Sequence, residues 1–397
     1  MIQDNDIVIV AAKRTPIGAM LGNLSTLSAP ELGAIAHKAA IQQANINADA
    51  IDEVISGCVL QAGIGQAPAR QAAIKADIPF GTGATTINKV CGSGMKAVML
   101  AHDLIKAGSA NIVLAGGMES MSNAPYLLSK ARAGYRLGHG TCFDHMFLDG
   151  LEDAYDKGRA MGYFADATAS RYHITREQQD AFAVQSMTRA LDAQKNNAFA
   201  DEITPITITG RKGDILITAD EAPDATKLAK IPQLKPAFQP TGTVTAGNAS
   251  SIADGAASLI LMTAGNAKAR GLKPLAKIVA HTSHSQAPAW FTTAPIDAIR
   301  TLLTKAQWTT DDVDLYEINE AFAVVAMAAI NELELNPERV NIRGGACALG
   351  HPIGASGARV LVTLIYALLH ENKTRGVAAL CIGGGEATAM AIEILHA

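Results

Sequence analysis

The chain contains one structural unit twice, and this internal repeat limits its possible folds more than any other feature of the sequence. The repeated features are an Ala-Pro pair that opens a helical stretch, a turn of small residues that opens another, and a strand that leads into glycines and a glutamate. The matching stretches are 29–30 with 294–295, 91–94 with 354–357, and 112–119 with 379–386. Because the matches keep their order and lie 263 to 267 residues apart, they indicate a duplicated unit.

Within each copy, apolar strand-like runs alternate with helical stretches. Buried strands are predicted at 7–10, 54–60, 112–115, 275–280, 313–318 and 377–382, and helices at 29–44, 94–107, 176–195, 295–305 and 356–370. This alternation predicts an α/β fold with largely buried sheets. We expect two halves, 1–120 and 246–397, around an inserted loop domain at 121–245 that lies as a lid across one face.

Composition excludes several classes of protein. Hydrophobic residues make up 49% of the chain and charged residues 18%, so a disordered chain is excluded and further subunits are expected to cover part of the surface. The formal net charge of −4 argues against nucleic acid or an anionic membrane as a partner, and no apolar run approaches the ~18 residues that span a bilayer. The five cysteines show no CxxC spacing and the acidic N-terminus lacks a signal-peptide pattern, so we expect free thiols and a cytoplasmic location.

The sequence also lacks the motifs of bound cofactors. It has no P-loop and no zinc-ligand spacing, and the glycines at 63–65 lack the rest of a dinucleotide fingerprint. His281 and His284 are interpreted as loop histidines without an acidic metal partner. We therefore expect no metal site and no resident cofactor.

Cys91 is the first candidate for a reactive group. It stands in a turn of small residues between a strand and a helix, where the free amides at the start of the helix point at the sulfur. Such a placement lowers the pKa of a thiol and makes it a nucleophile. A buried structural cysteine is the alternative.

His351 precedes the repeat partner of the Cys91 helix, and Pro352 keeps it in the loop before that helix. If the two copies lie around a pseudo-twofold axis, the starts of both helices approach each other, and His351 becomes a general base for Cys91. A loop histidine with a local hydrogen bond is the alternative.

Three further features lie at the ends of strands. Cys381 leads into three glycines whose amides suit an oxyanion hole, and the first copy has Leu114 at this position, which suggests that the copies divided their roles. Asn319 is either a ligand for a water or carbonyl or an ordinary helix N-cap. The small residues at 245–257 fit either close approach to a slender ligand or tight helix packing.

With these residues in view, the chain resembles the thiolase family over essentially its whole length. The matching stretches are 91–96, 319–322, 344–354 and 381–385, in order. The resemblance implies two duplicated halves in a five-layer αβαβα core with an inserted loop domain. The stretch 132–146 is similar to the loop of short-chain, biosynthetic-type members that form tetramers, so a homotetramer is implied.

The resemblance implies reversible Claisen condensation of two acetyl-CoA to acetoacetyl-CoA and CoA, with coenzyme A thioesters as substrates. Cys91 would carry the acetyl group, His351 would activate it, and Asn319 would position a water in the second oxyanion hole. Cys381 would remove the α-proton, and the amides of Cys91 and Gly383 would hold the acetyl-enzyme oxyanion.

The resemblance also implies a set of substrate contacts. Ser250 matches the serine beside the pantetheine arm, and the apolar walls match Leu151, Met161, Phe238, Ala246, Ile252, Ala321 and Phe322. The chain departs from the family pattern at Ala160, where a histidine is common, and at Phe291, beside the acyl pocket.

Three alternative functions share this fold. The first is a thiolase for longer or branched 3-ketoacyl-CoA esters. The second is a decarboxylating ketoacyl synthase, against which Asn319 and Cys381 argue because that class uses a second histidine and no second thiol. The third is a non-catalytic carrier of CoA or lipid.

Overall fold

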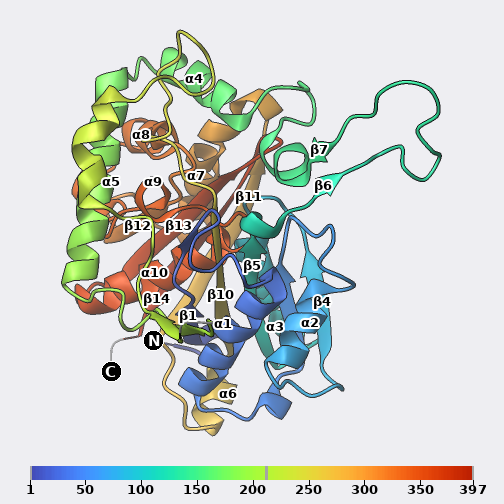
Figure 1. Ribbon diagram of the computed structural model, residues 1–397. Coiled ribbons are helices and arrows are strands. Elements are labelled where there is room, and N and C mark those ends of the chain that lie inside the picture. The colour runs from blue at the N-terminus through green and yellow to red at the C-terminus, as the bar shows by residue number, and fades with distance from the viewer. Residues whose placement is uncertain (1, 211–212, 396–397) are drawn as a thin grey trace.

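Two sets of strands meet edge to edge at a short contact between β1 (Ile7–Arg14) and β11 (Ala276–Ser285), where Val8 pairs with Lys277 and Ile9 with Ala276. The computed structural model describes residues 2–210 and 213–395, so the outer ends of the predicted halves, at 1 and 396–397, lie outside the described residues. The strands form one path in the order β12-β13-β14-β11-β1-β10-β5-β3-β4, which runs through the molecule in Figure 1.

The remaining elements of the core fall into two groups. The first-half elements are α1 (Ala29–Ala44), β3 (Glu53–Gly57), α2 (Pro68–Lys75), β4 (Gly83–Ile87), α3 (Ser93–Lys106) and β5 (Ile112–Ser120), followed after the insertion by β10 (Ala253–Thr263) and α6 (Ala264–Ala269). The second-half elements are α7 (Ala294–Ala306), β12 (Leu315–Ile318), α8 (Ala323–Glu332), α9 (Ala346–Leu349), α10 (Ser356–His370), β13 (Arg375–Ile382) and β14 (Glu386–Ile394).

The two sets of strands repeat one topology. In the first, β3 is parallel to β5, which is antiparallel to β10, which is antiparallel to β1. In the second, β12 is parallel to β13, which is antiparallel to β14, which is antiparallel to β11. The strand β4 pairs with β3, whereas its counterpart in the second half is a single parallel bridge between Tyr316 and Val340. The repeated pairing is what a duplicated unit produces.

Strand β10 pairs with β1 and β5, although it follows the insertion in sequence. It therefore belongs to the first set of strands, while the predicted second half begins before it, at residue 246. Strand β10 begins at Ala253, inside the cluster of small residues at 245–257.

Alternate residues of the strands face different core layers, as the period of two in a strand requires. Ile9 and Leu380 face a central layer filled by α3 and α10. Val8 and Leu114 face an outer layer covered by α1, and Ala379 faces the opposite outer layer covered by α7 and α8. Helices therefore lie on both faces of each set of strands and between the sets, which is the predicted five-layer αβαβα core.

In Figure 1 the insertion runs across the top of the core and down one side of it. It contains β6 (Tyr126–Leu127), β7 (Phe143–Asp144), α4 (Met161–Arg171), α5 (Arg176–Lys195), β8 (Ile206–Ile208) and β9 (Ile215–Ile217). Between β6 and β7 a long loop projects from the body, and every residue from 128 to 143 is exposed. Among the described residues, no helix is both long and apolar enough to cross a bilayer.

Candidate active site

The starts of α3 and α10 meet through a reciprocal pair of glycines. A Cβ atom on Gly94 would lie 2.8 Å from the backbone nitrogen of Ala358, and one on Gly357 would lie 2.4 Å from that of Met95. Both contacts are too close for a side chain, so the backbones touch only because both residues are glycine. Gly94 and Gly357 occupy matching positions of the repeat. The predicted approach of the two helix starts is therefore present, and it brings the loops of Cys91 and His351 together.

Cys91 is held by backbone amides. Hydrogen bonds from its own amide and from the amide of Gly383 favour the thiolate, but burial outweighs them and raises the pKa of Cys91 to about 11. The expected lowering of this pKa was wrong, because the sequence does not show how far the surrounding protein desolvates the sulfur of the partly buried Cys91. The two amides predicted to bind an oxyanion are nonetheless the two that point at the sulfur. Val90, just before, has φ of +44°, a strained value for a β-branched residue.

The hydrogen bonds of His351 fix its proton on Nδ1. The hydroxyl of Ser356 donates to the carbonyl oxygen of Pro352 at 3.0 Å, so it must accept from His351 Nδ1, which lies 2.6 Å away. Nε2 is left with a free lone pair. Burial, reinforced by the charge of Arg359, lowers the pKa of His351 to about 3. The imidazole is therefore neutral, with its acceptor nitrogen facing Asn319.

The orientation of Asn319 follows from its neighbours. Arg359 Nη2 lies 3.4 Å from Asn319 Oδ1, so the amide oxygen faces the guanidinium and Nδ2 faces His351 Nε2 at 3.5 Å. Arg359 is itself paired with Glu317 at 3.6 Å, and both side chains are buried. Asn319 is not the N-cap of α8, since that position is Phe322, and its Nδ2 is available to a water or carbonyl oxygen beside Nε2.

Cys381 lies at the end of β13, completely buried. Burial raises the pKa of its thiol well above the ordinary range, and the nearby Cys91 raises it further. Cys381 and Cys91 therefore lie close together as neutral thiols, one contributed by each half.

The predicted apolar walls fall into two groups. Met161, Phe238, Ala321 and Phe322 pack in one cluster with Cys381, and Phe291 belongs to the same cluster. Met161 also reaches the glycine turn, since its sulfur would lie 3.4 Å from a Cβ on Gly383. The second group brings Leu151 and Ile252 into the cluster that contacts Cys91.

Ser250 and Ala246 lie on the segment between these groups. The amide of Ser250 donates to the carbonyl of Ala321, whereas Ala246 is exposed. Ala246 is thus the one predicted wall residue for which the described contacts give no place in either cluster.

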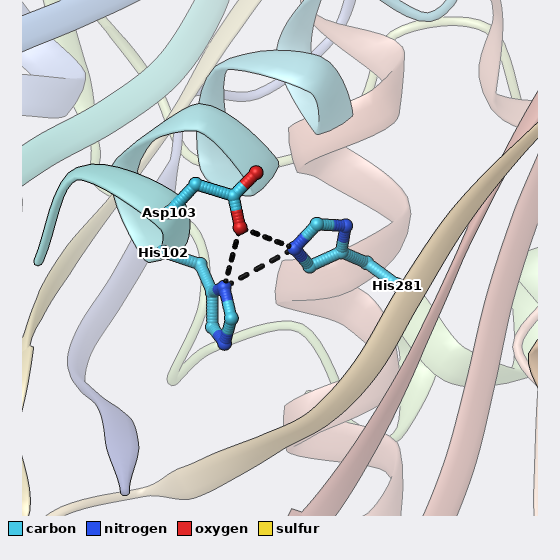
Figure 2. Close-up of side chains that lie close together, drawn as sticks. All are labelled: His102, Asp103 and His281. Carbon is cyan, nitrogen blue, oxygen red and sulfur yellow. Dashed lines mark hydrogen bonds and ion pairs between the residues drawn. The ribbon is translucent and has the colours of Figure 1, made fainter. Parts of the chain in front are cut away.

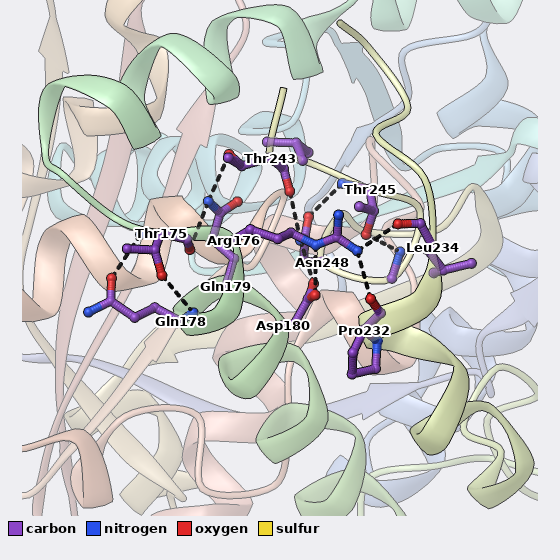
Figure 3. A network of polar contacts seen from close by, with 12 residues as sticks. Thr175, Arg176, Gln178, Gln179, Asp180, Pro232, Leu234, Thr243, Thr245 and Asn248 are labelled. Carbon is purple, nitrogen blue, oxygen red and sulfur yellow. Dashed lines mark hydrogen bonds and ion pairs between the residues drawn. The ribbon is translucent and has the colours of Figure 1, made fainter. Parts of the chain in front are cut away.

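A polar network fixes the segment that bears Ala246 and Ser250 (Figure 3). Arg176, at the start of α5, binds Asp180 Oδ2 at 2.6 Å and the carbonyl of Leu234 at 2.6 Å. Asn248 donates to Asp180 Oδ1 at 2.9 Å and accepts from the amide of Thr245 at 2.8 Å. Helix α5 and the segment 245–250 are therefore tied together by a buried, charge-assisted hydrogen bond between Asn248 and Asp180.

Sequence reasoning did not assign a role to Glu119, which joins the segment after β3 to the loop that follows His351. This buried carboxylate accepts from the amides of Val59, Leu60 and Gly354 at 2.9 to 3.1 Å. Burial raises its pKa to about 7 despite these bonds. The available signal was its match with Glu386 in the sequence repeat, although the structure places Glu386 in β14 and not in β13, the counterpart of β5. Ser356 and Arg359 were also missed, because only the folded chain shows which side chains they orient.

Two thiols, a neutral imidazole and a pair of convergent amides at the contact between duplicated α/β halves define an acyl-transferring enzyme. The comparisons with known proteins make this class specific. The model of the thiolase N-terminal domain matches residues 7–265, and that of the thiolase C-terminal domain matches residues 272–394. The chain belongs to the thiolase family.

Relatives are similar over nearly their full length. An acetyl-CoA acetyltransferase of Pseudomonas aeruginosa is 49% identical, with 98% of this chain and 99% of that protein covered. A probable acetyl-CoA acetyltransferase of Dictyostelium discoideum is 50% identical, with 98% and 94% covered.

Solved structures agree. The crystal structure of the Bacillus anthracis acetyl-CoA acetyltransferase has a TM-score of 0.96 at 42% identity, covering 98% of this chain and 99% of that one. The Acat5 thiolase from Ascaris suum in complex with coenzyme A has a TM-score of 0.93 at 43% identity, covering 98% and 100%.

Proposed function

We propose that the protein is an acetyl-CoA C-acetyltransferase, which condenses two acetyl-CoA molecules reversibly to acetoacetyl-CoA and CoA. The observation that supports it most is the convergence of two amides on the sulfur of Cys91, beside a second buried thiol. Full-length similarity to proteins named acetyl-CoA acetyltransferase supports the same acyl donor. The complex of a similar structure with coenzyme A supports the carrier.

In the first half-reaction, the sulfur of Cys91 attacks the thioester carbonyl while its proton passes to Nε2 of His351. The amides of Cys91 and Gly383 stabilise the oxyanion that forms. The carbon–sulfur bond to CoA then breaks, and the departing CoA sulfur takes the proton of Cys381. This leaves an acetyl thioester on Cys91, an imidazolium at His351 and a thiolate at Cys381.

In the second half-reaction, the Cys381 thiolate removes an α-proton from a second acetyl-CoA. Nδ2 of Asn319, through a water, and His351 stabilise the resulting enolate oxygen. The enolate carbon attacks the acetyl group on Cys91, the Cys91–carbon bond breaks, and the proton of His351 returns to the Cys91 sulfur. Each proton is restored, so the enzyme needs no further cofactor for this cycle.

The direct test is the intact mass of the protein after brief exposure to acetyl-CoA, beside Cys91→Ser. We expect one acetyl adduct that maps to Cys91 and is absent from the variant. A wild-type protein that binds CoA without forming an adduct would contradict the proposal and favour a non-catalytic carrier. Condensation that requires malonyl-CoA would favour the decarboxylating synthase instead.

We further propose that the subunits assemble into a homotetramer through the loop between β6 and β7, in the cytoplasm. The loop projects from the body, and its apolar side chains, including Leu128 and Leu137, are exposed in the single chain. Light scattering of the wild type and of a chain in which 130–141 is replaced by a short glycine linker tests this. A tetramer that persists without the loop would contradict it.

A further inference from the structure

A cluster of histidine and aspartate lies away from the thiols, where the two halves touch. His102 and Asp103 stand on α3, and His281 stands on β11 of the other half (Figure 2). At 1.5 Å of rise per residue, His102 lies roughly 15 Å along the helix from its start. In sequence His281 was interpreted as a loop residue without an acidic partner. The structure instead places it in a strand, against the carboxylate of Asp103.

The three facing atoms form a nearly equilateral triangle. Nδ1 of His102 lies 3.0 Å from Oδ1 of Asp103, Nε2 of His281 lies 3.0 Å from the same oxygen, and the two nitrogens lie 3.1 Å apart. If both nitrogens carry a proton, each donates a hydrogen bond to Oδ1 of Asp103, and two edges of the triangle are satisfied. The two N–H groups then face each other across the third edge. The short nitrogen–nitrogen edge is left without a partner proton.

A cation above the triangle satisfies all three atoms at once. Ligands bound at ~2.0–2.1 Å are separated by roughly 3.0 Å in octahedral and roughly 3.4 Å in tetrahedral coordination. The three edges of 3.0 to 3.1 Å lie at the octahedral end of this range, so the ligand atoms need to move by at most a few tenths of an ångström. The preorganised side chains offer three donors and leave further positions for water.

The donor set selects the kind of cation. Two imidazole nitrogens and one carboxylate oxygen suit Zn²⁺ and related transition metals rather than Mg²⁺ or Ca²⁺, which prefer oxygen. The His102 and His281 side chains are 19% and 16% exposed and that of Asp103 is 55% exposed, so an ion has access from solvent. Lys96 opposes the cation, since its charge also acts on His281.

We propose that His102, Asp103 and His281 form a Zn²⁺-type metal site that ties α3 of the first half to β11 of the second. A bound ion would replace the strained triangle with three metal–ligand bonds and would stabilise the contact between the halves. The site is independent of the acyl-transfer chemistry, because none of its residues belongs to the thiol site.

Calorimetric titration with Zn²⁺ tests the site, with His281→Ala and Asp103→Asn as the disrupting variants. His284→Ala is the matched control, since His284 lies on the same strand and hydrogen-bonds to Gln286 at 3.1 Å. Any Zn²⁺ that the cysteine thiols bind is common to all the proteins compared, because the thiols are present in every variant. We expect the wild type and His284→Ala to bind one more Zn²⁺ per chain than His281→Ala, and Asp103→Asn to bind this ion at least tenfold more weakly.

Thermal melts distinguish a lost metal ligand from a misfolded variant. Without metal, all four proteins should melt within a few degrees of each other, and Zn²⁺ should raise the melting temperature only where the triad is intact. Equal Zn²⁺ stoichiometry and affinity in all four proteins would overturn the proposal. So would a wild type that binds Zn²⁺ only at its thiols, as shown by loss of all binding in Cys91→Ser/Cys381→Ser.

Discussion

The ends of β5 and β13 occupy the same place in the two copies, yet only one of them faces the reaction. Asp52 accepts from the amides of residues 111 and 112, and Asp314 accepts from those of residues 374 and 375, so the counterpart of Cys381 in the first copy is Met118 and not Leu114. Met118 packs against apolar side chains of α1 and α2, whereas Cys381 of β13 lies beside Cys91. The two glutamates that match in the sequence repeat lie in different elements, Glu119 within β5 and Glu386 at the start of β14, and their surroundings differ as well. Glu119 is buried and holds three backbone amides, whereas Glu386 is partly exposed and pairs with Lys89 at 2.5 Å. Duplication thus kept the backbone and let side chains specialise, one copy for support and the other for proton transfer.

The largest effect should come from replacing the thiol of the second copy with an apolar side chain, as the first copy has in Met118, with Cys381→Leu. The variant lacks the thiol that removes the α-proton, so we expect condensation and thiolysis to fall by about 10²–10⁴-fold. Acetyl transfer to Cys91 should persist at a reduced rate. Coupled assays of both directions, with intact-mass detection of the adduct, measure the two outcomes separately.

Cys381→Ala is the control for the larger volume of leucine. If either variant condenses acetyl-CoA at the wild-type rate, Cys381 is not the base. If the alanine variant is active and the leucine variant is not, the role of Cys381 is steric.

The next largest effect should come from substituting the glycines through which α3 and α10 touch, a contact to which both copies contribute. Gly357→Ala places a methyl group against the backbone of Met95, and Gly94→Ala places one against the backbone of Ala358. Since backbone must shift in both, we expect each to reduce the free energy of unfolding by about 1–3 kcal/mol, with Gly357→Ala the more damaging. Urea denaturation measures both values. A neutral Gly357→Ala would show that the helices do not touch as described.

The pH dependence of stability distinguishes the two glutamates. Burial raises the pKa of Glu119 from 4.5 to about 7, so between these values the folded protein binds more protons than the unfolded chain. Stability should therefore fall as pH rises from about 4.5 to 7, and Glu119→Gln should flatten this slope. Glu386→Gln should not, because the pKa of Glu386 is lowered.

Urea midpoints at pH 5 and pH 7.5 check this prediction. The pKa of Glu317 is also raised, to about 8, so part of the decrease in stability with pH remains in every variant. The quantity to compare between variants is therefore the change in midpoint between the two pH values. Equal slopes in the wild type and Glu119→Gln would contradict the raised pKa.

The smallest effect should come from the wall of the acyl site. Phe291 packs in the cluster of Cys381 and Phe322, so Phe291→Ala leaves room beside the α-carbon of the substrate. We expect the ratio of kcat/KM for 3-ketohexanoyl-CoA to that for acetoacetyl-CoA to rise by about 10-fold. A wild type that already prefers the longer ester would support the alternative of a long-chain thiolase.

The sequence predicted the helices of this fold better than its strands. The helices at 29–44, 176–195 and 356–370 have the observed bounds, because caps and apolar periodicity mark them. Strand β14 was not predicted, since it is rich in alanine, which has no strong β preference. Pairing with β11 and β13 on both sides makes it a strand, and such long-range partners are not visible in local sequence.

The same limit applies to the site. Cys91, His351 and Cys381 stood out because turns of small residues surround them. The orientation of Asn319 by Arg359 and the meeting of Asp103 with His281 join residues far apart in sequence, so only the folded chain reveals them. Burial, which set the pKa of Cys91, was equally hidden.

The placement of the two thiols on opposite copies has a consequence for synthesis. The ribosome delivers Cys91 early and Cys381 about 290 residues later, close to the C-terminal end. At ~5–20 residues per second, a nascent chain spends roughly 15 to 60 s with the first thiol made and the second not yet made. During that interval the growing chain carries no complete set of reacting groups, so acyl transfer to carbon begins only after Cys381 has been made.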